Sequence, residues 1–339
     1  MVGGRRYRDR RDRRDAAGAP MIAVLAGGVG AARMLAALSE VVDPAELVAV
    51  VNTADDAVLN GLHISPDIDT VIYTLAGAID PERGWGLRAE TWRAMESLGR
   101  YAAVRPQGSA AAPTWFNLGD QDLATHLYRT ARLAEGATLS AVTAEIASAW
   151  GLAQRIVPMT DDPVRTRITL TSGAEIAFQE YFVQRRHGVP IAGVRFDGVA
   201  QARLGDGAAA ALAGAGTVVI APSNPIVSIG PIRALAAVDE LLGARRDTVV
   251  AVSPIVGGAA LKGPADRMMA ELGVPATVAG VAALYAGVAA TLVIDPADAH
   301  LADDVEAAGM RALVTPSVMS VPGVAARLAR QVLAAGGAR

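Results

Sequence analysis

Short apolar segments recur along the chain, and each is followed by a glycine-rich or polar loop and then by a helical pattern. This order constrains the fold strongly, because strands that alternate with helices form a mostly parallel sheet with helices on both faces. We therefore predict a Rossmann-like α/β fold, in which ligands bind at the carboxyl ends of the strands. The segments predicted as buried strands are residues 21–26, 47–52, 217–223, 248–254, 290–295 and 311–316.

Residues 155–200 interrupt this order. The segments VRTRITL, AEIAFQEYFVQRR and IAGVRFDGV alternate apolar and polar residues, and Ser172-Gly173 and Asp197-Gly198 mark turns between them. We predict a small antiparallel β insertion here, which divides the Rossmann-like core into residues 21–154 and 201–339.

Residues 1–20 form an arginine-rich tail with seven arginines and three aspartates. The whole chain carries a net charge of −3, so the remainder carries −7. We expect a solvated, disordered extension, or an over-long start with Met21 as the natural first residue. An export signal is disfavoured because Pro20 and the following glycines break the apolar stretch. The interspersed aspartates weaken a third reading, a nucleic-acid-binding arm.

The composition excludes several classes of protein. With 52% hydrophobic and 19% charged residues, the chain is not intrinsically disordered. It has no cysteine, and therefore no thiolate nucleophile or cysteine metal site. A mildly acidic body without a basic stripe argues against nucleic-acid binding, and no unbroken apolar run is long enough to span a membrane. We expect a cytoplasmic protein that acts on small molecules.

A glycine loop, Gly27-Gly28-Val29-Gly30-Ala31-Ala32-Arg33, follows the first predicted strand. Glycines at a strand end let the backbone approach a phosphate, and the start of the next helix favours its charge. The third glycine of the dinucleotide fingerprint is replaced by Arg33, so the match is imperfect. We interpret the loop as an anion site, and the alternative is a tight turn.

Four aspartates, Asp55, Asp56, Asp67 and Asp69, follow the second predicted strand. Carboxylates at a strand end are hard oxygen donors of the kind that hold Mg²⁺ beside a phosphate. Asp67 and Asp69 open a helix predicted from Asp69 to about Gly77. Helix capping and a solvated loop explain one or two of the four aspartates, but explain all four less well.

Three later segments also place polar residues beside predicted strands or helices. An aromatic pair precedes Leu118-Gly119-Asp120-Gln121-Asp122, which leads to His126, and could hold a flat heterocycle. Helix capping by Asp120 or Asp122 explains this spacing better. The other two are strand-end loops at residues 221–232 and 253–267, which offer hydroxyl and amide groups and Lys262, the single lysine of the chain. Their alternatives are a capped turn and an exposed cation.

Seven motifs in order resemble one family, the 2-phospho-lactate transferases of coenzyme F-420 biosynthesis. They are GGVGAAR, NTADD, GLHISPDIDTVIYTLAG, LGDQDLATH, MTDDPVRT, APSNPIVSIGPI and SPIVGGAALKGPADRMM, within about residues 21–320. The resemblance implies transfer of phosphoenolpyruvate or 2-phospholactate from a guanosine-diphosphate-activated donor to the ribityl hydroxyl of the deazaflavin Fo. GMP leaves, and Mg²⁺ is the implied cofactor. Such transfer requires positioning and charge neutralisation more than covalent chemistry.

The resemblance also implies roles for individual residues. Asp55 and Asp56 would hold the metal, and Asp55 and Asp69 would be catalytic. Acceptor-binding residues would be Asp67, Asp69, Thr70, Asp120, Gln121 and His126. Residues that bind the nucleotide and its phosphates would be Gly27, Gly28, Gly30, Ser223, Asn224, Ser228, Gly230 and Lys262.

One residue departs from the family pattern, and two other readings stay open. The pattern implies arginine at the position of Gln121, which cannot pair with an anion. A nucleotide-sugar-binding regulatory protein of the gluconeogenesis-factor type would share the glycine loop and the Asn-x-x-Asp-Asp region. A dinucleotide dehydrogenase would rest on the glycine loop alone. The resemblance also implies a homodimer, and the arginine and alanine bias suggests a high-GC bacterium, which favours phosphoenolpyruvate as the donor acid.

Overall fold

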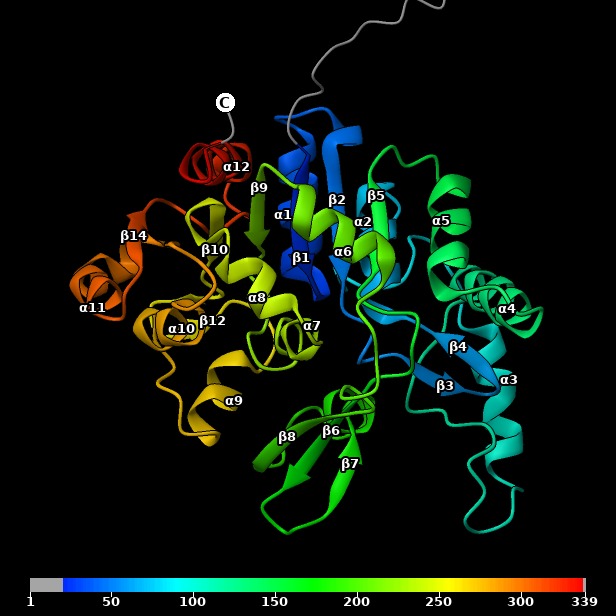
Figure 1. Ribbon diagram of the computed structural model, residues 1–339. Coiled ribbons are helices and arrows are strands. Elements are labelled where there is room, and N and C mark those ends of the chain that lie inside the picture. Colours follow the sequence, from blue (N-terminus) through cyan, green and yellow to red (C-terminus); the bar gives the residue numbers. More distant parts are fainter. Residues whose placement is uncertain (1–20, 338–339) are drawn as a thin grey trace, which may run out of the picture.

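The computed structural model describes residues 21–337, so the arginine-rich tail at 1–20 lies outside the described part of the chain. Its core is a seven-stranded sheet in which every pair of neighbouring strands is parallel (Figure 1). From one edge to the other, the strands are β14 (Arg311–Val314), β13 (Thr291–Ile294), β10 (Val249–Val252), β9 (Thr217–Ile220), β1 (Ile22–Ala26), β2 (Leu47–Val51) and β5 (Arg155–Pro158). The predicted Rossmann-like sheet is confirmed.

Both faces of the sheet are covered because the strands β1, β2 and β10 are apolar at every position. In β1, Ile22 and Val24 belong to one hydrophobic core, and Ala23 and Leu25 belong to another on the opposite face. The first core includes α1 (Gly28–Ser39), α2 (Pro66–Leu75), α5 (Leu139–Ala149) and α12 (Val324–Ala335). The second includes α6 (Asp206–Gly214), α8 (Val238–Gly243), α10 (Val278–Tyr285) and α11 (Ala302–Ala307).

The order of the strands places a crevice beside β1. The chain runs outward from β1 to β2 and β5, returns to β9 on the other side of β1, and runs outward again to β14. The direction of winding therefore reverses between β1 and β9. In open parallel sheets such a reversal leaves room for a ligand at the carboxyl ends of the strands.

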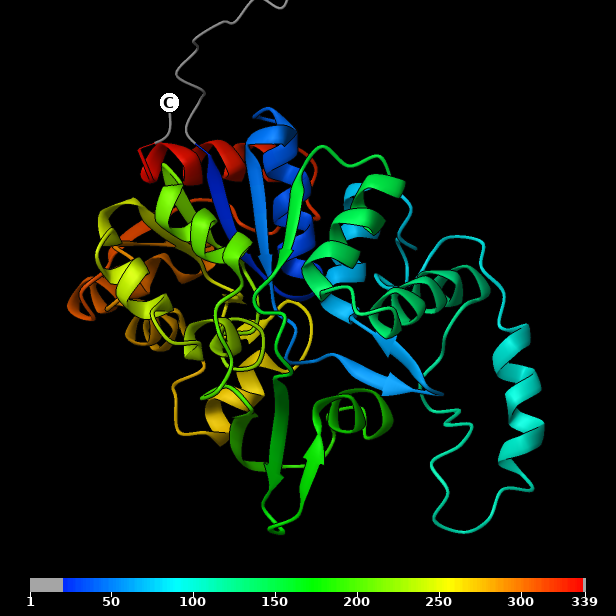
Figure 2. The same ribbon diagram turned by 45° about the vertical axis from the view of Figure 1, so that its right-hand side comes forward.

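Several short elements surround those carboxyl ends (Figures 1 and 2). One side has the hairpin β3 (Ala57–Leu59) and β4 (Leu62–Ile64), with α3 (Arg93–Ala102) and α4 (Asp120–Ala134). The other side has α7 (Gly230–Ala234), the hairpin β11 (Ile255–Val256) and β12 (Ala259–Ala260), and α9 (Ala265–Glu271). The described residues also form three 3₁₀ turns, which are η1 (Pro44–Glu46), η3 (Arg246–Thr248) and η4 (Pro296–Leu301).

A small antiparallel sheet lies beyond the carboxyl ends of the central strands, below the main sheet in Figure 1. It consists of β7 (Glu175–Ala177), β6 (Arg165–Leu170) and β8 (Ile191–Asp197), and a π-helical turn, η2 (Glu180–Gln184), follows β7. The predicted start of the insertion at residue 155 is wrong, because β5 pairs with β2 in the central sheet. A four-residue edge strand directly before an alternating segment could not be separated from it by periodicity alone.

Among residues 21–337, none of the helices combines the length and the apolar character that crossing a bilayer requires.

Candidate active site

A cavity of about 470 Å³ lies at the predicted place, between the loops that follow β1 and β9. The loops after β2 and β12, the starts of α2 and α4, and the π-helical turn η2 complete its walls. The structure thus brings together side chains from distant parts of the sequence. The predicted site residues that line the cavity are Gly27, Gly28, Gly30, Asp55, Asp67, Asp69, Thr70, His126, Ser223, Asn224, Ser228 and Lys262.

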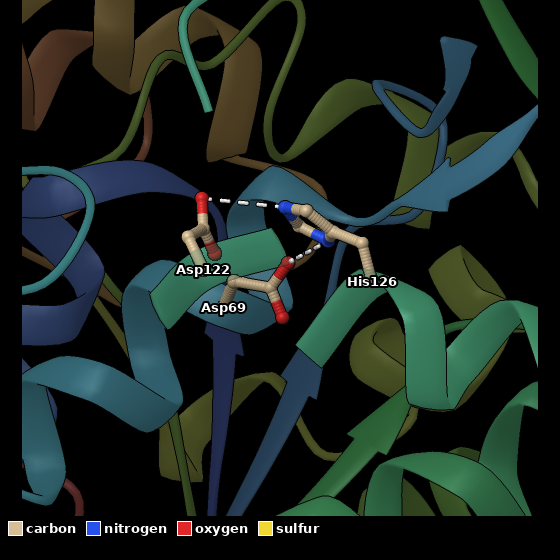
Figure 3. A group of neighbouring side chains, drawn as sticks. All are labelled: Asp69, Asp122 and His126. Carbon is tan, nitrogen blue, oxygen red and sulfur yellow. Dashed lines mark ion pairs between the residues drawn. The ribbon is translucent and has the colours of Figure 1, made fainter. Parts of the chain in front are cut away.

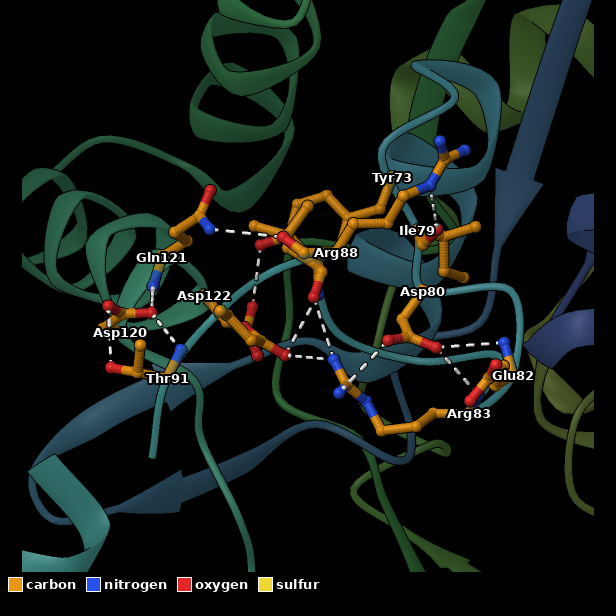
Figure 4. A network of polar contacts seen from close by, with 12 residues as sticks. Tyr73, Ile79, Asp80, Glu82, Arg83, Arg88, Thr91, Asp120, Gln121 and Asp122 are labelled. Carbon is orange, nitrogen blue, oxygen red and sulfur yellow. Dashed lines mark hydrogen bonds and ion pairs between the residues drawn. The ribbon is translucent and has the colours of Figure 1, made fainter. Parts of the chain in front are cut away.

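Four predicted site residues lie outside this lining. Asp56 accepts a hydrogen bond from the Ser65 hydroxyl at 2.7 Å. Asp120 is exposed and bonds to Thr91, and the amide of Gln121 donates to the Arg88 carbonyl at 3.3 Å (Figure 4). Gly230 begins α7, behind the loop that reaches the cavity.

Each glycine of the loop after β1 has its own structural reason. A methyl group at Gly27 would lie 2.7 Å from Cβ of Ser228 and 2.9 Å from Oδ2 of Asp67. Gly28 has φ of +70°, which side chains disfavour. A methyl group at Gly30 would clash with the Pro222 carbonyl oxygen in the loop after β9. Close approach of the two strand-end loops therefore requires this glycine pattern.

The carboxylate of Asp67 occupies the start of α1. Its Oδ1 accepts the Gly28 amide at 2.8 Å, and its Oδ2 accepts the Asn52 side-chain amide at 3.0 Å. Pro66 at the first position of α2 places Asp67 in the first turn, because the helix begins at Pro66 rather than at the predicted Asp69. The Gly28 amide is therefore taken by a carboxylate, and the next two amides of this helix start have no partner within the helix.

Two buried carboxylates, Asp55 and Asp67, and the partly buried Asp56 surround the end of β2, and we call these three the strand-end aspartates. Burial raises the pKa of Asp55 well above its ordinary value, and the charge of Asp67 adds to this. Burial also raises the pKa of Asp56 to about 7 and that of Asp67 to about 6. Among residues 21–337, Oδ1 of Asp55 and Oδ1 of Asp56 have no hydrogen-bond partner.

A second pair, Asp69 on α2 and Asp122 on α4, has its partners built in, and we call these the helix aspartates. Arg129 is fully buried, and its guanidinium donates to both carboxylate oxygens of Asp69. The Tyr73 hydroxyl donates to Oδ1 of Asp122 at 2.7 Å. Burial opposes the charged form of Asp122, but contacts with His126 and Tyr73 outweigh it and lower the pKa. His126 lies between the two carboxylates (Figure 3).

The strand-end aspartates and the helix aspartates differ in how well they could bind a metal ion. Asp69, Asp122 and His126 offer one ligand atom each within 4.8 Å. However, Arg129 already binds both oxygens of Asp69, and its Nη1 lies 3.2 Å from Nδ1 of His126, so a cation there would meet a fixed positive charge. The unpartnered Oδ1 of Asp55, beside the charge of Asp67, fits a hard cation such as Mg²⁺ better.

Aromatic side chains form another wall of the cavity. The aromatic residues that line it are Trp85, Trp115, Phe116, Phe178 and Phe182, and Trp85 is 41% exposed. The guanidinium of Arg83 lies 5.3 Å from the ring centroid of Trp85 and 5.0 Å from that of Trp92. Arg83 also forms ion pairs with Asp80 (Figure 4) and with Glu90, and these pairs hold the loop in place. The wall suits a flat heterocycle.

Lys262 reaches across the mouth of the cavity. Its Nζ donates to the Arg83 carbonyl at 3.2 Å, which joins the loop after β12 to the loop after α2. Burial lowers the pKa of Lys262, and the charge of Arg33 contributes. The ammonium is therefore placed where it can also meet an anion that enters the cavity.

Sequence reasoning predicted His126, but it missed the buried Asp122 and Arg129 on the same helix and three cavity residues beside the small sheet. Asp122, His126 and Arg129 are spaced i, i+4 and i+7, which puts them on one face of α4. Three polar residues on one buried helix face would have been a usable signal. Phe178, Gln179 and Phe182 reach the cavity because the small sheet packs over it, and the Gln179 side chain bonds the Asp55 carbonyl at 2.9 Å. No local sequence pattern predicts that the small sheet packs over the cavity.

The family model for 2-phospho-L-lactate transferase CofD matches residues 22–315 of this chain. The chain is also similar to proteins named phosphoenolpyruvate transferase. One from Streptomyces griseus is 40% identical over 316 residues, which cover 92% of this chain and 97% of that protein. One from Mycobacterium tuberculosis is 38% identical over 327 residues, which cover 91% of this chain and 96% of that protein.

A crystal structure of a UPF0052 family member from Bacillus halodurans is similar in fold. It covers 94% of this chain and 100% of its own, with a TM-score of 0.58 and 13% sequence identity. A second structure of that protein gives a TM-score of 0.59. At this identity the likeness concerns the fold alone.

Proposed function

The chain belongs to the 2-phospho-L-lactate transferase family, and from this premise we propose that it transfers a phosphorylated three-carbon acid to the deazaflavin Fo. The donor is guanosine-diphosphate-activated phosphoenolpyruvate, or 2-phospholactate in its place. The ribityl hydroxyl oxygen bonds to the phosphorus that carries the acid, and the bond from that phosphorus to the GMP oxygen breaks. The hydroxyl gives up its proton, and GMP leaves.

One observation carries the proposal: a helix start suited to phosphate and an unpartnered buried carboxylate share one cavity. The first turn of α1 and the loop of Ser223, Asn224 and Ser228 supply backbone and side-chain donors for a diphosphate. Lys262 adds a cation at the cavity mouth. A diphosphate beside the strand-end aspartates would otherwise suffer repulsion between like charges.

We propose that a bound Mg²⁺ offsets the repulsion between the diphosphate and the aspartates. Asp55 would hold it through its unpartnered oxygen, and Asp56 would support the site from behind. When bound, the ion neutralises charge on the phosphate oxygens during transfer. In this proposal the cofactor is required because Asp55 and Asp67, two buried carboxylates whose charges repel each other, cannot both be ionised cheaply beside a phosphate.

The acceptor would bind along the aromatic wall, with its polyol directed at α2 and α4. Arg129 already donates to both oxygens of Asp69, so we assign Asp69 to orienting the acceptor rather than to taking its proton. Asp67 lines the cavity and has a pKa of about 6, which suits a general base at neutral pH. Asp67 is therefore proposed to receive the hydroxyl proton.

A turnover assay read by mass spectrometry tests this function. Purified protein receives Fo and Mg²⁺ with either activated phosphoenolpyruvate or activated phospholactate, and parallel samples contain EDTA. We expect product and GMP in equal amounts from one donor, with loss of both in EDTA. Leu127→Ala, an exposed change on α4, serves as the matched control and should keep full activity.

Absence of product from both donors would overturn the proposal. If the protein still bound a guanine nucleotide or a nucleotide sugar tightly, the regulatory binding protein of the gluconeogenesis-factor type would replace it. Product with one donor alone would identify the three-carbon acid. Size-exclusion chromatography with light scattering on the same sample tests the proposed homodimer.

A further inference from the structure

The contact between Arg129 and His126, two buried residues of α4, determines which ring nitrogen of His126 carries a hydrogen. Arg129 has no exposed surface, and its Nη1 lies 3.2 Å from Nδ1 of His126. Nη1 also lies 3.1 Å from Oδ2 of Asp69 and 3.4 Å from the His63 carbonyl oxygen. A guanidinium can only donate, so a hydrogen bond between Nη1 and Nδ1 requires that Nδ1 accepts and carries no hydrogen. The alternative partner of Nδ1, Oδ2 of Asp69, lies 3.7 Å away, beyond hydrogen-bond distance. The single N–H of the imidazole is therefore at Nε2.

This N–H is buried beside the cavity and has no straight partner. Nε2 lies 3.2 Å from Oδ2 of Asp122, yet it has no hydrogen-bond partner of good geometry among residues 21–337. Oδ1 of Asp122 is occupied by the Tyr73 hydroxyl. Both His126 and Asp122 line the cavity. A donor and an ionised acceptor therefore lie side by side at its wall (Figure 3).

A hydroxyl group is the ligand that satisfies both atoms at once. An oxygen about 2.8 Å from each atom accepts from Nε2–H and donates its own hydrogen to the carboxylate. A phosphate or carboxylate would satisfy His126 but would be repelled by Asp122 and Asp69. An ammonium would satisfy Asp122 but would meet the N–H of His126 and the nearby guanidinium of Arg129.

We propose that His126 and Asp122 form a hydroxyl-binding pair that positions one hydroxyl of the polyol acceptor. Arg129 determines which ring nitrogen of His126 carries the hydrogen, and we call this the polarity of the pair. His126 is the donor and Asp122 is the acceptor. His126 is then neither a general base nor a metal ligand, because its one lone pair is held by Arg129. The identity of the ligand as the polyol acceptor rests on the proposed function. The position of the hydrogen on His126 rests only on the contacts of His126 within the protein.

Nitrogen-15 NMR of histidine-labelled wild-type protein tests the polarity without any turnover. The chain has four histidines, and the signals missing from His126→Gln assign the ring of His126. We expect one proton, on Nε2, in the absence of ligand. A proton on Nδ1, or protons on both nitrogens, would overturn the proposal whatever the activity.

Two substitutions test the binding role. The amide of His126→Gln can place an N–H near the position of Nε2, whereas the shorter His126→Asn reaches only the position of Nδ1. We expect His126→Gln to stay within about 10-fold of wild type in KM for Fo and His126→Asn to lose about 10- to 100-fold in kcat/KM. The KM for the activated donor should not change in either variant. Circular dichroism checks that both variants fold.

An Fo analogue that lacks one ribityl hydroxyl completes the design. One deoxy analogue should lose about 10- to 100-fold in kcat/KM with wild type and lose little more with His126→Asn. Equal losses for Gln and Asn, or additive losses for every analogue, would overturn the hydroxyl-binding pair. Wild-type protein that makes no product at all would instead overturn the proposed function, and the NMR result would still decide the polarity.

Discussion

The strand-end aspartates and the helix aspartates lie at the same cavity, yet the protein balances their charges in opposite ways. Arg129 provides Asp69, and Tyr73 provides Asp122, with a partner from the chain itself. Asp55 and Asp56 keep an unpartnered oxygen each, and burial raises their pKa. The difference teaches that burial alone does not define a reactive carboxylate. A carboxylate whose counter-charge is missing is prepared for an external ligand, whereas Asp69, whose counter-charge is the buried Arg129, serves as a framework.

Loss of Arg129 should have the largest effect on stability. Arg129→Met leaves Asp69 buried without its cation, and breaking a buried pair from one side costs about 3–5 kcal/mol. Urea unfolding followed by circular dichroism measures this cost. The matched control is Arg132→Met on the same helix, where the ion pair with Glu145 is at the surface and should matter little. Equal effects of the two changes would mean that the helix aspartates do not depend on an internal cation.

Asp55→Asn should separate activity from stability. Removing the charge that faces the cavity should lower kcat by about 10²- to 10³-fold, as loss of one electrostatic group does in other enzymes. Unfolding free energy should stay the same or rise, because the change removes a buried carboxylate that lacks a partner. The control is Asp303→Asn, exposed on α11. A destabilised but active Asp55→Asn would reverse the roles of the two groups.

The two groups should also respond to pH with opposite signs. Asp56 has a pKa of about 7 in the folded protein, against an ordinary 3.8, so the folded state keeps a proton that the unfolded chain releases. Its contribution to unfolding free energy therefore falls as pH rises from about 4 to about 7. Asp122 has a lowered pKa, so its contribution is lost only as pH falls below its ordinary range.

Denaturant unfolding in EDTA, at pH values from 3 to 8, tests this contrast. Asp56→Asn should flatten the fall between about pH 4 and 7, relative to wild type. Asp122→Asn should instead reduce the loss of stability in acid. If both variants changed the same part of the curve, the two groups would not be balanced differently.

Gln121→Ala should have the smallest effect. Gln121 lies outside the cavity lining and makes one long bond to the Arg88 carbonyl. Loss of a surface contact should change the unfolding free energy by less than about 0.5 kcal/mol. Transfer to Fo should also stay near wild type. A large rise in the KM for Fo would show that this surface side chain reaches the acceptor after all.

The sequence predicted the sheet well because β1, β2 and β10 are apolar at every position, the other strands are largely apolar, and glycine or polar loops follow them. The same rule located Asp55, Asp67 and the Gly27–Gly30 loop at one edge, since carboxyl ends of parallel strands meet there. It could not tell which aspartate has a partner, because Arg129 is 60 residues beyond Asp69 in the chain. Strand β5 was assigned to the wrong sheet, since pairing with β2 is a long-range choice. The place of Phe178 and Phe182 in the cavity wall could not be predicted, because it depends on how the small sheet packs.

The contact of Lys262 with the Arg83 carbonyl has a practical consequence. Because Lys262 is the single lysine of the chain, amine-reactive reagents have one side-chain target, and it lies at the mouth of the cavity. Its lowered pKa makes the neutral, nucleophilic amine more abundant than at an ordinary lysine. A fluorophore attached there, with the amino terminus blocked, would report entry of each substrate directly. The protein thus contains a natural attachment point for observing its own cavity fill and empty in real time.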